Sequence, residues 1–210
     1  MIRQEYYYTH IKIVHSFTPI KLKLRTTIYI ISFKFEKILE ATNVEKAISV
    51  MNEAEKIDIA FFDISMPKNN HSNLEDGIDL ALYFKTKHPN AKIVFITMHS
   101  EFHILLKAIH LVNPEVFISK NDIDTFTFNS ILKALKNDKL FYSEEMLAVL
   151  KWTKKSKVKL DIYDFKILSL TNKGIKTKEL TNHLPLSLSA IEKRKSNIKL
   201  ILSDFKGISF

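Results

Sequence analysis

The sequence predicts an α/β fold, a doubly wound parallel sheet of five strands, followed by an all-α domain. Three observations lead to this fold class. Short apolar runs alternate with helical patterns over residues 1–136, the strand signal ends after residue 159, and the surplus of positive charge lies in the C-terminal part. Strands that alternate with helices of about 10–15 residues indicate βαβ crossovers and hence a parallel sheet.

Apolar runs define the strands of the predicted sheet. Residues 57–62 and 91–96 are apolar at nearly every position, which is typical of strands that are buried on both faces. Shorter runs complete the set. The predicted strands are 11–14, 35–39, 57–62, 91–96 and 116–118.

Helical periodicity fills the segments between these strands. Asn43 is suited to cap a helix because its side chain can accept a hydrogen bond from the first turn, and Val44, Ala47 and Met51 then share one face. Pro19 is expected near the first turn of an earlier helix. The predicted helices are 19–31, 43–51, 74–87, 101–111 and 123–135.

The chain is expected to contain two domains. Residues 1–136 form the α/β domain, and residues 137–159 are interpreted as a linker because 151–159 are polar and basic. Residues 160–210 form the second domain, with helices at 162–172, 177–183 and 187–202. Gly174 can end the first of these helices, and Trp152 in the linker is expected to make an interdomain contact.

Composition excludes several classes of protein. The 210 residues include no cysteine, which excludes disulfides, thiolate metal sites and a cysteine nucleophile. Apolar runs are far shorter than the roughly 20 residues that span a bilayer, and no signal peptide is recognised at the N-terminus. We therefore expect a cytoplasmic protein that does not bind membranes.

The charge is distributed unevenly. Residues 1–150 hold 18 basic and 18 acidic residues, whereas residues 151–210 hold 14 basic and 5 acidic residues, which accounts for the whole net charge of +9. A basic module beside a neutral body favours a polyanionic partner, with nucleic acid first. A lysine-rich solvated surface is the alternative.

Polar residues that follow the strands are the candidate site. In a parallel α/β sheet, ligands bind at the carboxyl ends of the strands. The residues at these ends are His15 with Ser16, then Asp63, Thr97 and Lys120.

The segments that contain these residues resemble the receiver domain of response regulators, which has a flavodoxin-like fold. Asp63, in the run 61–67, is similar to the phosphoacceptor of that family, Thr97 to its hydroxyl residue, Lys120 to its lysine and Phe117 to its switching aromatic residue. The resemblance implies that Asp63 carries an acyl phosphate whose oxygens Thr97 and Lys120 hold. It also implies Mg²⁺, held partly by Asp63, and a sensor histidine kinase as partner.

One departure from the family affects the metal site. Receiver domains place two acidic residues after the first strand, where this chain has His15 and Ser16. Asp63 is then a working phosphoacceptor with weakened Mg²⁺ binding, or part of a pseudo-receiver in which Asp63, Thr97 and Lys120 form a structural cluster. We favour impaired phosphorylation because carboxylate charge dominates Mg²⁺ binding. An ordinary aspartate at the end of a strand is the third interpretation.

The C-terminal residues resemble the LuxR-type helix-turn-helix of the NarL class, over residues 160–202. The matching residues are Leu160, Ile167, Leu168, Gly174, Lys178, Glu179, Leu180, Leu184, Ser187, Ile191, Ser196, Asn197 and Ile198. The resemblance implies a DNA-binding domain. The chain departs from the family at three points. Asp164 stands where the family usually has glutamate, Glu192 would repel phosphate, and the segment after residue 202, where the family adds a fourth helix, is short.

Residues 187–202 have the pattern of a recognition helix. Leu188, Ile191, Ile198 and Leu202 form an apolar stripe, and Ser189, Lys193 and Ser196 lie opposite it with Glu192 and Lys199 beside them. Arg194, Lys195 and Lys178 are expected to contact phosphates.

A DNA-binding transcriptional regulator is therefore the leading hypothesis, and an enzyme is not expected. The alternative is a protein-interaction module, in which a pseudo-receiver binds a partner and the helix-turn-helix binds DNA weakly. The pair His99 and His103 could also hold zinc, but surface histidines are the favoured interpretation. The sequence leaves open whether two copies form a homodimer.

Overall fold

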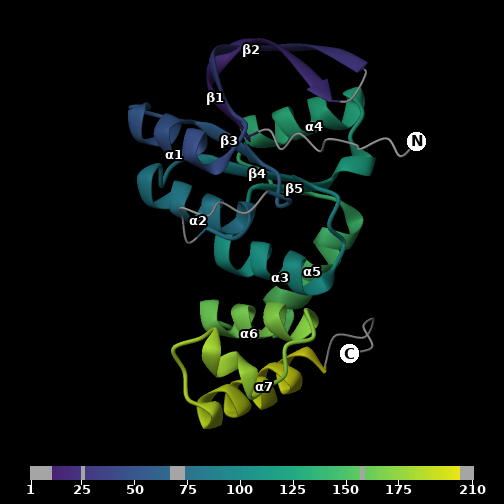
Figure 1. Ribbon diagram of the computed structural model, residues 1–210. Helices are drawn as coiled ribbons and strands as arrows, with labels where there is room; N and C mark the ends of the chain where they lie inside the picture. The colour runs from purple at the N-terminus through teal and green to yellow at the C-terminus, as the bar shows by residue number, and fades with distance from the viewer. Residues whose placement is uncertain (1–10, 25–26, 67–73, 157–158, 204–210) are drawn as a thin grey trace, which may run out of the picture. The chain divides into compact units, whose positions relative to one another are not determined.

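The structure is a computed structural model that describes residues 11–24, 27–66, 74–156 and 159–203, with side chains from residue 38 onward. Two compact units divide the chain. The first contains residues 1–99 and 114–143, and the second contains residues 100–113 and 144–210 (Figure 1).

The first unit contains one sheet with the strand order β2-β1-β3-β4-β5-β6. Four strands run parallel, namely β3 (Ile59–Phe62), β4 (Lys92–Thr97), β5 (Val116–Ser119) and β6 (Phe141–Tyr142). The other two, β1 (Ile11–Leu24) and β2 (Thr27–Ala41), form an antiparallel hairpin, and β1 is antiparallel to β3. The predicted α/β class with a parallel sheet is confirmed, with four parallel strands rather than five.

The predicted helix over 19–31 is wrong, because this segment belongs to the hairpin. Lysine and leucine alternate over 21–24, and β-branched and aromatic residues fill 27–31. The alternation has the two-residue period of a strand, and the β-branched and aromatic run has a high propensity for extended backbone. Pro19 stands at a register shift of the hairpin, where an irregular ladder tolerates a residue without an N–H donor.

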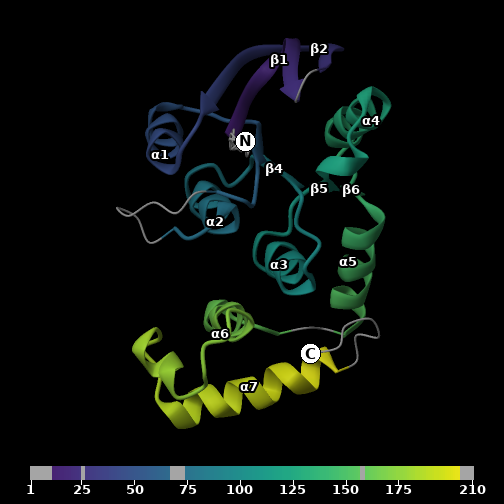
Figure 2. The ribbon, with the colours of Figure 1, turned by 45° about the vertical axis from the view of Figure 1, so that its right-hand side comes forward.

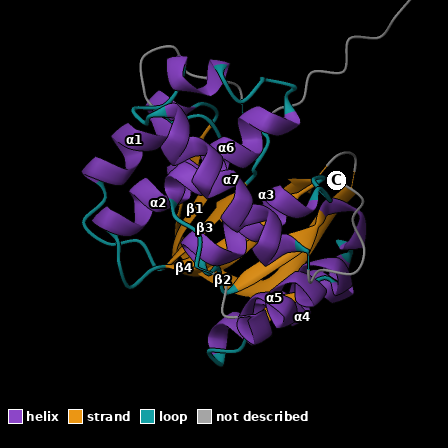
Figure 3. Ribbon diagram, turned by 90° about the horizontal axis from the view of Figure 1, so that it is seen from below, coloured by secondary structure: helices purple, strands orange, loops and turns teal. Residues whose placement is uncertain are grey.

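Helices cover both faces of the sheet. The helices α1 (Val44–Glu53) and α2 (Gly77–Lys87) lie on one face, and α4 (Thr125–Lys136) lies on the other (Figures 2 and 3). Successive residues of β3 point to opposite faces: Phe62 packs against Phe84 of α2 with 5.5 Å between ring centroids, and Phe61 packs against Phe128 of α4 at 6.2 Å. The unit is therefore doubly wound.

The second unit consists of helices. Its first segment is α3 (Phe102–Lys107), which continues into the π-helix η1 (Ala108–Val112), and α5 (Glu144–Ser156) follows later in the chain. The last segments are α6 (Ile162–Asn172), the 3₁₀ helix η3 (Glu179–Asn182) and α7 (Leu188–Leu202), which lies across α6 (Figure 2). The first and third helices of the predicted all-α domain thus have the predicted bounds to within one residue, and the second is shorter than predicted.

The segment predicted to be a linker is largely ordered structure. Residues 137–159 include β6, which pairs with β5, and α5, whose Met146, Val149 and Leu150 are buried. Trp152 contacts Phe102 of α3 at 5.5 Å between ring centroids, and both residues belong to the second unit. Because α3 packs with α5 and α6, the division of the chain does not follow the predicted boundaries at residues 136 and 160.

Among the described residues, every helix is too short or too polar to cross a membrane.

Candidate functional site

Three predicted site residues lie close together at the carboxyl ends of neighbouring strands. Asp63 follows β3, Thr97 ends β4 and Lys120 follows β5, where the short 3₁₀ helix η2 (Lys120–Asp122) begins. Because β4 lies between β3 and β5, the three residues are close in the fold although 57 positions separate Asp63 from Lys120. The Lys120 ammonium forms a direct ion pair with Oδ2 of Asp63.

The Asp63 carboxylate is buried and has a partner at both oxygens. Asp63 is 8% exposed, Oδ1 accepts the backbone N–H of Ser65 at 3.0 Å, and Oδ2 accepts from Lys120. A buried carboxylate requires such partners, since an unpaired buried charge is strongly unfavourable. The ion pair with Lys120 therefore compensates the negative charge of Asp63.

Thr97 and Phe117 are both fully buried. The Thr97 hydroxyl accepts the backbone N–H of His99 at 3.0 Å, so it is held within its own loop. Phe117 packs between Phe95, at 5.5 Å, and Tyr142, at 6.3 Å between ring centroids. The aromatic ring that the family resemblance identifies as a switch therefore occupies an inward position.

Sequence analysis missed a contact between the two loops of the site. Ser65 Oγ and His99 Nε2 are 2.9 Å apart, which joins the loop after β3 to the loop after β4. Each residue stands two positions beyond a predicted site residue, Asp63 and Thr97. A polar residue two positions after each predicted site residue is therefore the pattern that could have identified Ser65 and His99.

Gly77 fixes the loop that carries Asp63. Its N–H donates to the carbonyl of Ile64 at 3.1 Å. A Cβ atom at this position would lie 1.9 Å from the carbonyl oxygen of Asp63, so only glycine permits this approach of α2 to the loop.

The first predicted strand does not deliver His15 and Ser16 to this edge. In the antiparallel register, Val14 pairs with Ile59 at the start of β3, so the backbone of His15 and Ser16 lies beyond the end of β3 opposite to Asp63. The difference follows from the reversed direction of β1. The side chains of His15 and Ser16 lie outside the described residues.

Mg²⁺ is the ion that the family resemblance implies for this site. This ion requires oxygen ligands and usually one or two carboxylates. Within the described ranges, no group of three histidine, aspartate or glutamate residues could hold a metal ion. Asp76, which could have substituted for a missing carboxylate, instead caps α2 by accepting the N–H groups of Ile78 and Asp79, each at 2.9 Å.

The second candidate surface is the exposed side of α7. Of the predicted apolar stripe, Ile191, Ile198 and Leu202 are buried and Leu188 is half-buried. The residues that the sequence places opposite, Ser189, Lys193 and Ser196, are exposed, as are the neighbouring Glu192 and Lys199. Leu200, which sequence analysis did not single out, is 71% exposed on the same helix.

Arg194 has an internal role in the structure. Its Nη1 lies 2.9 Å from Oδ2 of Asp161 and 2.7 Å from Oδ1 of Asp164, and its guanidinium lies over the ring of Tyr163. Asp161 and Asp164 also form the capping box of α6. The hydrogen bonds to Asp164 and then Asp161 raise the pKa of Arg194 above its usual value. Arg194 therefore joins α7 to the start of α6.

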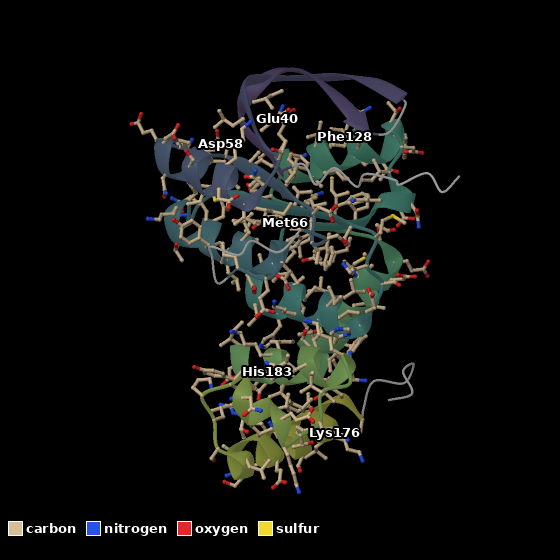
Figure 4. All side chains as sticks on the ribbon, viewed as in Figure 1. Glu40, Asp58, Met66, Phe128, Lys176 and His183 are labelled. Atoms are coloured by element: carbon tan, nitrogen blue, oxygen red, sulfur yellow. The ribbon has the colours of Figure 1, made fainter. Side chains whose placement is uncertain are left out.

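The two other predicted phosphate contacts differ from each other. Lys195 donates to Oγ1 of Thr177 at 2.8 Å and thus holds the turn after α6 against α7. Lys178 is exposed on that turn, as is Lys176, which Figure 4 labels.

Comparison with known proteins gives one family and a set of related folds. The model of the response regulator receiver domain matches residues 19–136. RcsB of Salmonella enterica serovar Typhimurium, bound to the promoter P1flhDC in the presence of phosphomimetic BeF3−, matches with a TM-score of 0.52 and 22% identity, over 79% of this chain and 78% of that chain. RcsB bound to the promoter rprA matches with a TM-score of 0.51 and 21% identity, over the same 79% and 78%. A comparison with curated protein sequences finds no match.

Proposed function

We propose that this chain, which belongs to the response regulator receiver domain family, regulates transcription by binding DNA through its C-terminal helices. The observation that carries the proposal is the exposed polar and basic side of α7 in a segment of 14 basic and 5 acidic residues. A helix with such a side fits the major groove, and the positive charge supplies affinity for phosphate.

One further observation supports DNA as the partner. The chain, a receiver followed by three helical segments, is similar in fold to RcsB. The two RcsB structures contain promoter DNA. Arg194 and Lys195 support the geometry of the module rather than the contact itself, because both are bonded to residues of the same unit. The direct contacts are therefore assigned to Lys178, Ser189, Glu192, Lys193, Ser196 and Lys199.

Selection from a random DNA pool tests this function. We expect the full chain to enrich one short sequence and to bind it more weakly as salt increases. Lys193→Ala should weaken binding, whereas Lys139→Ala, which removes an exposed lysine of the first unit, should not. Binding that selects no sequence would contradict the proposal and favour the protein-interaction module, for which the exposed carboxylate of Glu192 is the specific support.

For the receiver unit we infer impaired phosphorylation at Asp63. In a working site the carboxylate attacks a phosphorus atom, and Thr97 and Lys120 hold the transferred oxygens. Here Lys120 is already paired with Oδ2 of Asp63, and the described residues do not fit the metal that would neutralise the incoming phosphate. Regulation would then come from a partner protein that docks on this unit or from pairing of two copies, and a sensor histidine kinase is the expected partner only if Asp63 accepts phosphate.

Incubation with acetyl phosphate and Mg²⁺, followed by intact mass measurement, tests this inference. We expect no phosphorylated species from the native chain or from Asp63→Asn. A Mg²⁺-dependent phosphorylated species that Asp63→Asn abolishes would show a working phosphoacceptor. A phosphorylated species that persists in Asp63→Asn would place the modification elsewhere.

A further inference from the structure

An exposed leucine lies on the side of α7 that is proposed to face DNA. Leu200 is 71% exposed and is one of four large apolar residues with high exposure in the described part of the chain. Its neighbours Lys199 and Asn197 are also exposed, whereas Ile198 and Leu202 are buried. A leucine in this position does not contribute to the core of the module.

Helix geometry places Leu200 on a defined line. Residues 189, 193, 196 and 200 are separated by four, three and four positions, which align on one side of an α-helix. This line is opposite to the buried line of Ile191, Ile198 and Leu202. Ser189, Lys193, Ser196 and Leu200 therefore form the outermost row of α7, which we call the central row.

We propose that Leu200 is a specificity-determining residue that packs against the C5 methyl group of a thymine in the major groove. The inference rests on the proposed DNA binding and goes beyond it by assigning a base. Thymine alone presents an apolar group in the major groove, and apolar side chains are the contacts that recognise it.

The rest of the central row fits this assignment. Ser189 and Ser196 are small, so they allow the helix to approach the base edges closely. Lys193 can donate to O6 and N7 of a guanine. Lys193 and Leu200 are seven residues apart, about 10.5 Å along the helix axis, so the two side chains would reach different base pairs.

The charge of the surroundings favours DNA over a second protein as the occupant of this surface. Residues 151–210 carry 14 basic and 5 acidic residues. Two copies of this module would repel each other across a shared α7 surface, whereas a polyanion would be attracted. The apolar contact with thymine then adds selectivity to an affinity that is mainly electrostatic.

A thymine-to-deoxyuracil series tests the inference, because this change deletes one methyl group and leaves all hydrogen-bonding groups in place. The DNA is the site that the full chain selects from a random pool. We expect deoxyuracil at one thymine to weaken binding about four-fold, the value of one buried methyl group, and other thymines to be insensitive.

The variant Leu200→Ala tests whether the side chain of Leu200 is the partner of the thymine methyl group. It should bind the thymine and deoxyuracil sites equally, because the side chain that contacts the methyl group is gone. Leu140→Ala, which truncates a leucine that is 50% exposed in the first unit, should keep the four-fold difference. Both variants should retain the native thermal midpoint, since exposed residues contribute little to stability.

The outcomes separate this inference from the proposed function. A selected site whose affinity is unchanged by deoxyuracil at every thymine, or a four-fold loss that persists in Leu200→Ala, overturns the role of Leu200 and leaves DNA binding intact. Failure to select any sequence overturns the proposed function instead. A change in oligomeric state in Leu200→Ala, measured by sedimentation, would assign the residue to a contact between copies and also overturn the inference.

Discussion

Gly77 shows how a single residue positions the candidate phosphoacceptor. The loop after β3 turns Asp63 toward Lys120, and α2 begins where Gly77 meets the backbone of that loop. A side chain at residue 77 cannot be accommodated by rotation, because the atom it would meet is the Asp63 carbonyl oxygen. The loop can hold the Asp63 carboxylate in this position only because residue 77 has no Cβ atom.

Gly77→Ala should destabilise the protein by about 1–3 kcal/mol, the usual cost of forcing an extra methyl group into a packed site. Urea denaturation of the full chain measures this change. Gly174→Asn is the matched control: Gly174 has a φ of 83° and no atom within 4 Å of its would-be Cβ, and asparagine tolerates this conformation. Equal stability of Gly77→Ala and the native chain would contradict the close approach.

At the scale of elements, the contact between α6 and α7 depends on one cation and two carboxylates. Burial raises the pKa of Asp161, but hydrogen bonds from the backbone of Asp164 and from Arg194 outweigh burial and leave that pKa below its usual value. The lowered pKa means that the charged form of Asp161 is favoured in the folded state. Its stabilising contribution is therefore present above pH about 4 and is lost as the pH falls through the folded-state pKa.

Asp161→Asn isolates this contribution, because asparagine caps a helix as well as aspartate does but carries no charge. We expect the variant to be less stable than the native chain at pH 7 and the difference to shrink below pH about 4. Denaturant titrations followed by circular dichroism across this range provide the measurement. Glu192→Gln, which removes an exposed carboxylate of α7, is the control and should leave the stability at pH 7 nearly unchanged.

The helix α5 provides a second prediction at this scale. Val149 and Leu150 are buried within the second unit, so the lysines of α5 should resist trypsin. Leu150→Asp should expose them to rapid cleavage by placing a charge in the core, whereas Ala148→Asp, at an exposed position of the same helix, should not. Rapid cleavage of the native chain at Lys151 or Lys154, mapped by mass spectrometry, would restore the interpretation of this segment as a linker.

At the scale of the whole molecule, the separation of charge predicts how binding depends on salt. Residues 1–150 are electrically neutral and residues 151–210 carry the net charge of +9. Each phosphate contact contributes about 0.9 to the slope of log affinity against log salt concentration. Removing a contact in the basic segment should therefore lower the slope, and removing a lysine elsewhere should not.

Lys193→Ala and Lys199→Ala test this dependence by fluorescence anisotropy at several salt concentrations. If Lys199 contacts a phosphate, its loss should lower the slope by about one on every DNA sequence. Lys193, assigned to a base, should instead change the preferred sequence. Lys139→Ala, in the neutral part of the chain, should leave both properties unchanged. A smaller slope in Lys139→Ala would show that the first unit also contacts DNA.

The sequence by itself determined the features that depend on local pattern. The runs 57–62 and 91–96 are apolar segments that overlap the buried strands β3 and β4. Asn43 caps a helix as predicted, and α7 begins within one residue of the predicted start at Ser187. The meeting of Asp63 and Lys120 also followed from pattern, because the carboxyl ends of neighbouring parallel strands share an edge. The periodicity of α7 also predicted the exposure of Ser189, Lys193 and Ser196, which the structure confirms.

Tertiary structure decided what local pattern left ambiguous. Residues 19–31 fit a helix by their proline and length, but the pairing of β1 with β2 made them strands, and the reversed β1 moved the backbone of His15 and Ser16 away from Asp63. Likewise, the sequence predicts that Arg194 contacts phosphate, whereas the fold places the carboxylates of Asp161 and Asp164 beside it. Partners distant in sequence set strand direction and ion pairing, and no single segment contains that information.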